Sequence, residues 1–126
     1  LRFRNINIGI GCRKNTSSEE IINFIKEELR KRNLSIKGIR ALGTIEAKKK
    51  EKGIIEAAKY FDCSLEIFSL EDIREVEDKF KKSEFVKKTL GVYSVAEPCA
   101  YLLQGRKGSP REKKNGITLS VEVQNE

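Results

Sequence analysis

Asn5 to Ile25 read NINIGIGCRKNTSSEEIINFI, and the order of signals in this stretch sets the fold class. Ile6, Ile8 and Ile10 alternate with small or polar residues, the period-2 pattern of a β-strand. A second apolar set follows at helical spacing and lies on one face of the helix: Ile21, Ile22, Phe24, Ile25 and Leu29. The stretch therefore predicts a strand, a glycine-containing turn and then a helix.

The turn between this strand and helix carries cations and two helix-start signals. Gly9 and Gly11 lack a Cβ, so backbone or ligand can approach closely. Two hydroxyl residues each precede a carboxylate by three positions, the spacing of a capping box: Thr16 before Glu19, and Ser17 before Glu20. Backbone N–H groups and the positive end of the helix dipole would face the space beyond the strand, beside Arg13 and Lys14, which is typical of an anion site.

This turn matches neither of the two common phosphate motifs. Gly11 is followed by Cys-Arg-Lys instead of the P-loop spacing, and the third glycine of the dinucleotide fingerprint is missing. An ordinary β-α turn with solvated cations is therefore the competing interpretation.

Composition narrows the classes of protein and partner. A chain of 126 residues has the size of one domain, and its 26 Lys and Arg against 19 Asp and Glu give a formal net charge of +7. This balance favours an acidic partner such as a nucleic acid, an anionic membrane or a polycarboxylate ligand. Part of the excess positive charge can also belong to a Lys/Glu-rich surface of the kind found in thermophile proteins. Without His, a general acid or base must be Asp, Glu, Lys, Tyr, Cys or water.

Several features of the sequence concern the compartment and the ends of the chain. Three cysteines far apart, in no CxxC pair, fit a reducing cytoplasm better than disulfides or zinc. No apolar run approaches the roughly 18 residues of a membrane helix, and no signal-peptide pattern opens the chain. The sequence contains no Met, although a natural start would keep one before a bulky residue such as Leu1, so we expect a domain cut from a longer polypeptide.

Further strands and helices alternate along the rest of the chain. We expect strands at about 39–42, 65–68 and 117–123, helices from about 53, 70, 84 and 95, a charged loop at 44–52, and loop or frayed strand at 106–115. Ser83 would cap the helix of residues 84–90. The alternation predicts an α/β fold: a single domain, 1–126, built as a three-layer α/β/α sandwich around a mostly parallel, mixed sheet of about four to five strands.

Sites in such folds lie beyond the carboxyl ends of the strands. The loops expected there are 11–17, 44–52 and the one before Ser69, and the first two are rich in basic or polar residues. We therefore predict that residues 11–17, 48–53 and 94–97 converge at one end of the sheet.

Five motifs in register resemble the C-terminal domain of CbiG, a cobalamin-biosynthesis protein, which is similar to the stand-alone protein CobE. They are GIGCRK at 9–14 with SSEEI at 17–21, IEAKKKEKGI at 45–54, Ser83-Glu84, GVYSVAEPCA at 91–100, and ITLSV at 117–121. Gly108-Ser109-Pro110 interrupts a region where the family has a hydrophobic strand. Pro98 and Cys99 stand where the family has small alanine-like residues.

The resemblance implies a hydrolase of the anaerobic pathway that opens the δ-lactone of cobalt-precorrin-5A and releases acetaldehyde. Cobalt would arrive within the substrate, so no protein metal site and no other cofactor are implied. The flat ring carries acetate and propionate carboxylates, which Lys, Arg and helix N-termini would bind. The candidate substrate-binding residues are Gly9, Gly11, Cys12, Arg13, Lys14, Thr16, Ser17, Ser83 and Ser94. The candidate catalytic residues are Glu51 and Glu97 as general bases and Lys48 as the group that stabilises the oxyanion.

Each of these residues also has a purely structural interpretation. Glu97 three residues after Ser94 fits a capping box, Ser83 is a helix cap, and Lys48 lies in a run of lysines that solvent would cover. Lys48 and Glu51 stand at i, i+3, within reach of an ion pair on a helix.

Three classes of function therefore remain open. They are a lactone hydrolase domain that works with other domains of the same protein, a non-catalytic corrinoid-binding or carrier module, and a nucleic-acid-binding module. Only the net charge supports the last, because no aromatic-interleaved basic strand and no helix-turn-helix pattern occurs.

Overall fold

The computed structural model describes residues 4–82, 87–88 and 94–124. The strands are β1 (Ile6–Cys12), β2 (Ile39–Ile45), β3 (Ser64–Phe68), β4 (Glu112–Lys114) and β5 (Ile117–Val123). The α-helices are α1 (Ser18–Lys31), α2 (Lys52–Tyr60), α3 (Leu70–Val76) and α5 (Ala96–Gln104). Short 3-10 helices, η1 (Ile36–Gly38), η2 (Glu46–Lys48) and η3 (Glu77–Lys79), complete the described elements.

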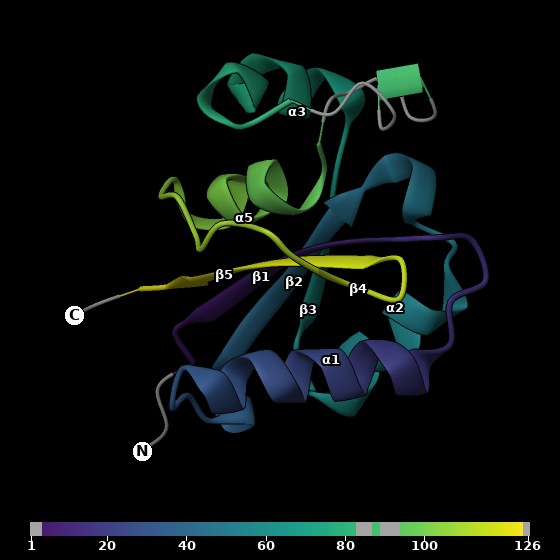
Figure 1. Ribbon diagram of the computed structural model, residues 1–126, viewed down its shortest axis with the longest axis vertical. Helices are drawn as coiled ribbons and strands as arrows, with labels where there is room; N and C mark the ends of the chain where they lie inside the picture. Colours follow the sequence, from purple (N-terminus) through teal and green to yellow (C-terminus); the bar gives the residue numbers. More distant parts are fainter. Residues whose placement is uncertain (1–3, 83–86, 89–93, 125–126) are drawn as a thin grey trace.

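The strands form one mixed sheet in the order β3-β2-β1-β5-β4 (Figure 1). β1, β2 and β3 run parallel, whereas β5 runs antiparallel to both β1 and β4. This confirms the predicted mixed α/β sheet. The last strand returns antiparallel through a short hairpin instead of a helical crossover.

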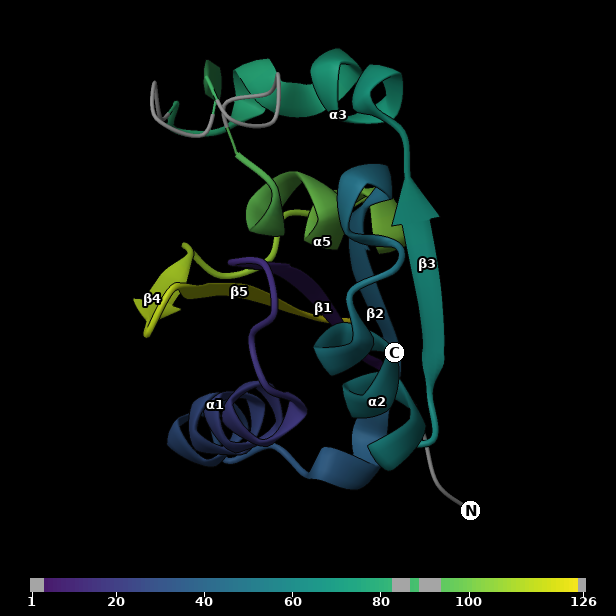
Figure 2. The ribbon, with the colours of Figure 1, turned by 90° about the vertical axis from the view of Figure 1, so that its right-hand side faces the viewer.

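Helices cover both faces of the sheet, as the three-layer prediction requires. α1 and α2 lie on one face, and α5, with α3 outside it, lies on the other (Figures 1 and 2). The larger core joins the isoleucines of β1 to the inner faces of α1 and α2, and it includes Ile6, Ile8, Ile10, Ile21, Ile25, Leu29, Ile54 and Ala57. A smaller cluster under α3 and α5 contains Ile45, Ile73, Val95 and Cys99.

Local signals account for where the elements begin and end. Ser17 caps α1 by accepting from the Glu20 N–H at 3.2 Å, so the second of the two predicted capping positions is the one used. Asn33 (φ 57°) and Gly105 (φ 72°) adopt the left-handed conformation just past α1 and α5. The predicted charged loop at 44–52 begins later than expected, because β2 continues to Ile45, where it pairs with Phe68.

The polar side of β1 is buried, not solvated. Asn7 is fully buried on the face opposite the isoleucines, where it donates to Glu122 at 2.8 Å and accepts from Arg40 at 2.7 Å. Arg40 also lies 3.6 Å from Glu66 on β3, and Arg106 lies 3.4 Å from Glu122. These contacts link four neighbouring strands and satisfy the buried polar groups of the sheet.

Candidate functional site

The carboxyl ends of β1, β2 and β3 lie at the same edge of the sheet because the three strands are parallel. Cys12, Ile45 and Phe68 are the last residues of these strands. Cys12 pairs with Ile117, so the turn between β4 and β5 reaches this edge as well. The two polar loops predicted at 11–17 and 44–52 begin after the strands, at 13–17 and 46–51, and leave the sheet side by side.

The first loop turns sharply to start α1. Asn15 takes a left-handed conformation (φ 62°), and the Thr16 hydroxyl donates to the Arg13 carbonyl at 2.6 Å. The hydroxyl of Ser17 occupies the cap position. The start of α1 thus faces the carboxyl edge, with its positive dipole end toward that side.

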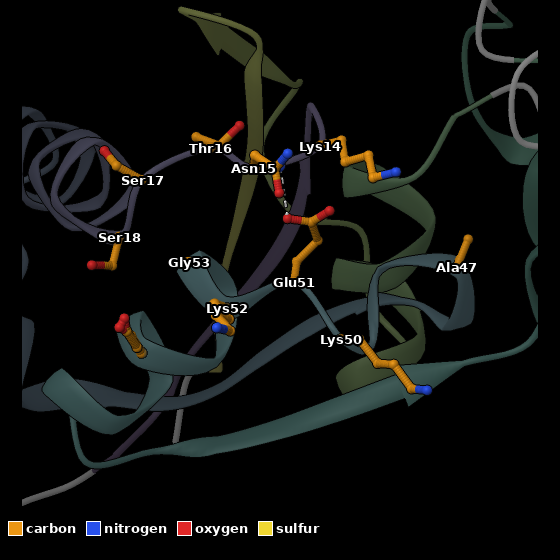
Figure 3. Close-up of a pocket in the computed structure, with 11 residues that line it drawn as sticks. Lys14, Asn15, Thr16, Ser17, Ser18, Ala47, Lys50, Glu51, Lys52 and Gly53 are labelled. Carbon is orange, nitrogen blue, oxygen red and sulfur yellow. Dashed lines mark hydrogen bonds between the residues drawn. The ribbon is translucent and has the colours of Figure 1, made fainter.

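The second loop is held against the first by two contacts. The Glu51 carboxylate accepts from the backbone N–H of Asn15 at 3.0 Å (Figure 3). Gly53 packs so closely on the first loop that a Cβ there would lie 2.2 Å from the Thr16 carbonyl oxygen. Glu51 precedes α2 but makes no side-chain cap for it, since its carboxylate reaches across to the neighbouring loop.

An open cleft of about 650 Å³ lies between the two loops. Lysines from both walls border it, beside the Glu51 carboxylate (Figure 3). The carboxylates of Glu51 and Glu56 partly offset the positive charge of these lysines. The lining residues are Lys14, Asn15, Thr16, Ser17, Ser18, Ala47, Lys50, Glu51, Lys52, Gly53 and Glu56. The combination of ammonium groups, a helix start and one bridging carboxylate suits binding of carboxylates and proton transfer to or from water.

Six of the predicted site residues gather at this cleft or directly behind it. Lys14, Thr16, Ser17 and Glu51 line the cleft. Cys12 lies behind Thr16, and its thiol interacts electrostatically with Lys48 and Glu51. Burial raises the pKa of the Cys12 thiol, and Lys48 and a hydrogen bond with Thr16 oppose this rise only in part, so the thiol is held in its neutral form at neutral pH.

The two glycines of the β1 motif face away from the cleft. Gly9 lies under α5, where a Cβ would come within 1.8 Å of the Ala96 carbonyl oxygen. Gly11 faces Val95 and Thr118 at ordinary contact distances. The missing Cβ of Gly9 therefore lets α5 approach the sheet, whereas Gly11 has room for a Cβ. A ligand contact at either glycine stays a prediction.

Arg13 also points away from the cleft. Its side chain lies over the hairpin turn, where a Cβ on Gly116 would come within 2.7 Å of Arg13 Cδ. Arg13 is thus separated from Lys14, which lines the cleft. The side chains of Arg13 and Lys14 leave the turn in different directions, so adjacent positions in the sequence do not place both residues at the cleft.

The start of α5 reaches the same edge on the opposite face of the sheet. Val95, just before α5, packs against Gly11 and Ile45, which confirms that residues 94–97 approach the ends of β1 and β2. Ser94 is 3% exposed, and its hydroxyl has no hydrogen-bond partner in the described part of the chain. The three predicted segments therefore share an edge, although only two of them share the cleft.

Two predicted pairings take other forms. α5 has no side-chain cap, and Glu97 lies 3.6 Å from Arg111 instead of closing a capping box with Ser94. Lys48 and Glu51 are joined by a backbone hydrogen bond, Glu51 N–H to the Lys48 carbonyl at 3.0 Å, and not by the predicted ion pair. Ser83 and the helix predicted at 84–90 fall largely outside the described residues.

Several cleft residues were not predicted as site residues. Asn15, Ser18, Lys50, Lys52 and Glu56 line the cleft along with predicted residues. The sequence could have indicated the contact between the two loops at Gly53, because glycine in the first turn of a helix is unfavourable unless another backbone packs there. Asn15 could have indicated the sharp turn of the first loop, since Asn is enriched at positions with a left-handed backbone.

The sheet, its helices and the lysine-bordered cleft define an α/β/α sandwich domain whose candidate site lies at the carboxyl edge. The family described as Cobalamin synthesis G C-terminus matches residues 6–122, and the chain belongs to this family. This confirms the resemblance found in the sequence.

Curated relatives carry names from the same pathway. The chain is 36% identical over 133 residues to the probable cobalt-precorrin-5A hydrolase of Methanocaldococcus jannaschii, covering 95% of this chain and 41% of that protein. It is 34% identical to the cobalt-precorrin-5A hydrolases of Salmonella typhimurium and Priestia megaterium, covering 91% and 90% of this chain and 33% and 31% of theirs. The chain thus spans well under half the length of these relatives.

Solved structures share the fold over nearly the whole chain. CobE, a protein from the cobalamin biosynthetic pathway, superposes with a TM-score of 0.84 at 20% identity, covering 99% of this chain and 94% of that one. The cobalamin biosynthesis protein chiG of Agrobacterium tumefaciens gives a TM-score of 0.73 at 26% identity, covering 96% and 99%. No helix in the described ranges combines the length and apolarity needed to cross a membrane.

Proposed function

We propose that the chain acts in cobalamin biosynthesis as the C-terminal domain of a cobalt-precorrin-5A hydrolase, and that its cleft binds the carboxylate arms of the corrinoid substrate. One observation carries this proposal. Loops 13–17 and 46–51, distant in the sequence, meet with the first residues of α1 and α2 in a single cleft bordered by lysines. The names of the curated relatives support the choice of substrate.

The chemistry of the substrate matches the groups in the cleft. A corrinoid intermediate presents several carboxylates around a flat apolar ring. Lys14 on one wall and Lys50 and Lys52 on the other would each meet a carboxylate, and backbone N–H groups at the start of α1 would donate hydrogen bonds to another. Cobalt would arrive in the substrate, so we assign no protein ligand to it.

Glu51 is the residue in the cleft best suited to act as general base. Its carboxylate is half-exposed, forms no ion pair with Lys48 and is oriented by the Asn15 N–H. In lactone opening, Glu51 would take a proton from the water that attacks the carbonyl carbon. The ring C–O bond would then break, the leaving oxygen would take up the proton that Glu51 had gained from water, and Lys48 would stabilise the oxyanion.

Glu97 is the weaker candidate for the base. Its carboxylate is largely buried, lies beside Arg111 and belongs to the opposite face of the sheet. We therefore assign Glu97 to the packing of α5 against the C-terminal segment.

Binding and turnover test the proposal separately. Cobalt-precorrin-5A is titrated into residues 1–126 and followed by its absorption spectrum, and acetaldehyde is assayed with the full-length polypeptide. Replacing Lys14 and Lys50 together with Gln should weaken binding by about tenfold, since each exposed ion pair contributes up to about 1 kcal/mol. The matched control is Lys37→Gln, because Lys37 is exposed near the amino ends of the strands. Equal affinity in the double variant and the control would refute the assignment of the cleft.

A second candidate is a corrinoid-binding module without catalysis. The observation that favours it is that this chain covers 94% of the CobE chain and 99% of the chiG chain, so the fold occurs as a chain of this extent. A binding spectrum with no loss of acetaldehyde formation in a full-length Glu51→Gln variant would support this candidate over the hydrolase. Displacement of the corrinoid by a single-stranded oligonucleotide would instead point to the nucleic-acid alternative.

A further inference from the structure

The carboxylate of Glu51 is held in place from outside its own helix. Glu51 occupies the cap position of α2, where a side-chain oxygen can accept from N–H groups of the same helix, but it forms no such bond. Its carboxylate accepts instead from the Asn15 N–H at 3.0 Å, and Figure 3 shows the side chain extending from the second loop toward the first. The place of this carboxylate therefore depends on how closely the two loops approach.

Asn15 supplies the donor through its backbone conformation. Its φ of 62° lies in the left-handed region, which Asn and Gly tolerate and which strains a β-branched residue. The N–H and the hydroxyl of Thr16 both donate to the Arg13 carbonyl, at 3.3 and 2.6 Å, and these bonds close the turn around Asn15. The Asn15 N–H is not used within the turn and is directed at Glu51 on the other loop.

Gly53 sets how closely the loops approach. A Cβ at this position would lie 2.2 Å from the Thr16 carbonyl oxygen and 3.3 Å from the Ser18 nitrogen, which are both backbone atoms. Since real Cβ atoms essentially never come closer than 3.0 Å, an alanine would push the loops apart by about 0.8 Å. The distance between Asn15 N and Glu51 Oε2 would then exceed the roughly 3.2 Å that limits an ordinary N–H···O bond. Gly53 is only two residues from Glu51, so this displacement reaches the carboxylate directly.

We propose that Asn15 and Gly53 are positioning residues, which hold the Glu51 carboxylate at the place from which it takes a proton from the attacking water. This inference rests on the proposed function, in which Glu51 is the general base. A base must lie within hydrogen-bond reach of the proton that it removes, and a displacement of about 1 Å can slow a reaction about 100-fold. Asn15 contributes the donor and Gly53 the close approach of the loops, so both act through Glu51.

Hydrogen exchange of the Asn15 amide, followed by NMR, tests the positioning without any corrinoid. Residues 1–126 contain both apolar clusters and match the extent of two solved chains, so they are used alone. The protection factor of this amide should fall at least about threefold in Glu51→Ala, which removes the acceptor, and in Gly53→Ala, which separates the loops. Lys37→Gln, near the amino ends of the strands, should leave it unchanged. Equal protection in Gly53→Ala and the parent would overturn the role of Gly53.

Two variants at Asn15 test the turn separately from the packing at Gly53. The Asn15 side chain is exposed, so neither variant disturbs the core, and the comparison holds even where Gly53→Ala unfolds the domain. Asn15→Gly keeps the left-handed conformation and should retain the protection factor of the residue-15 amide within about twofold. Asn15→Val cannot adopt this conformation without strain and should lose at least about threefold. Equal protection in the two variants would overturn the role of the turn.

Acetaldehyde release by the full-length polypeptide tests whether the positioning serves the reaction. Gly53→Ala should lower kcat at least about tenfold. The double variant Glu51→Gln with Gly53→Ala should be no slower than Glu51→Gln alone, because a residue that acts through Glu51 has no base left to position. Losses that multiply in the double variant would overturn the proposal and make Gly53 a residue of the fold only. Unchanged turnover in Glu51→Gln would refute the base itself, and the exchange data would still decide whether Asn15 and Gly53 hold its carboxylate.

Discussion

Gly9→Ala tests whether the glycine of β1 is there for the helix or for a ligand. The added Cβ would lie 1.8 Å from the Ala96 carbonyl oxygen and 2.5 Å from the Ala100 nitrogen. Both are backbone atoms of α5, so no side-chain rotation relieves the clash. Since real Cβ atoms essentially never come closer than 3.0 Å, α5 would have to move away from the sheet by about 1.2 Å.

The size of the effect follows from what α5 covers. Moving α5 disturbs its packing on β1, β2 and β5, and overpacking of a core costs about 1–3 kcal/mol, occasionally more. The loss of glycine's freedom in the unfolded state offsets about 0.4–1 kcal/mol of this. Because the clash is with rigid backbone, we expect the upper end of this range, a net loss of about 2 kcal/mol, which corresponds to a fall of roughly 8 °C in Tm for a domain of this size.

Gly11→Ala is the matched control on the same strand and the same face. Its added Cβ would meet Val95 Cβ at 3.4 Å and Thr118 Oγ1 at 3.5 Å, which are ordinary contacts. We expect its free energy of unfolding to stay within about 1 kcal/mol of the parent. Thermal and urea unfolding measure both variants. A Gly9→Ala protein as stable as the parent would refute the packing argument, and equal losses in both variants would show that the distances do not govern the result.

Three further predictions concern single side chains. Burial raises the pKa of Glu28, but hydrogen bonds from Arg32 (2.7 Å) and Lys31 (3.1 Å) outweigh it and lower the pKa below its usual 4.5. Its stabilising contribution is therefore present above about pH 4.5 and lost as pH falls through the lowered pKa, so Glu28→Gln should be less stable than the parent at pH 6, and in urea unfolding the difference should shrink as pH is lowered below 4.5. Burial also raises the pKa of the Cys99 thiol strongly, and native protein at pH 8 should leave Cys99 unalkylated by iodoacetamide while denatured protein reacts fully; labelling in the native state would contradict its burial. Glu51→Gln should lower acetaldehyde release by the full-length polypeptide at least about 100-fold with corrinoid affinity and Tm retained, whereas a Tm loss of several degrees would make Glu51 a structural residue.

The elements of this fold could be predicted because their signals are local. Alternation of Ile6, Ile8 and Ile10 encodes one buried face of a strand, and the Ser17 hydroxyl meets an N–H only three residues away. Asn33 and Gly105 ended helices as expected, since left-handed conformations depend on the residue itself. Parallel pairing of β1 with β2 then brought loops 13–17 and 46–51 together, as the order of strands and helices implied.

The partners of individual side chains were decided by tertiary packing. Gly9 meets α5 almost 90 positions later in the chain, so nothing near it in sequence distinguishes a packing glycine from a ligand-binding one. Arg13 turns to the hairpin at Gly116, the Glu51 carboxylate bonds to Asn15, and Glu97 lies beside Arg111. Sequence periodicity reports which face of an element is apolar, because that depends on backbone geometry alone. The contacts of long charged side chains depend on which helices and strands pack next to them. Those neighbours are determined only when the sheet and its helices have assembled.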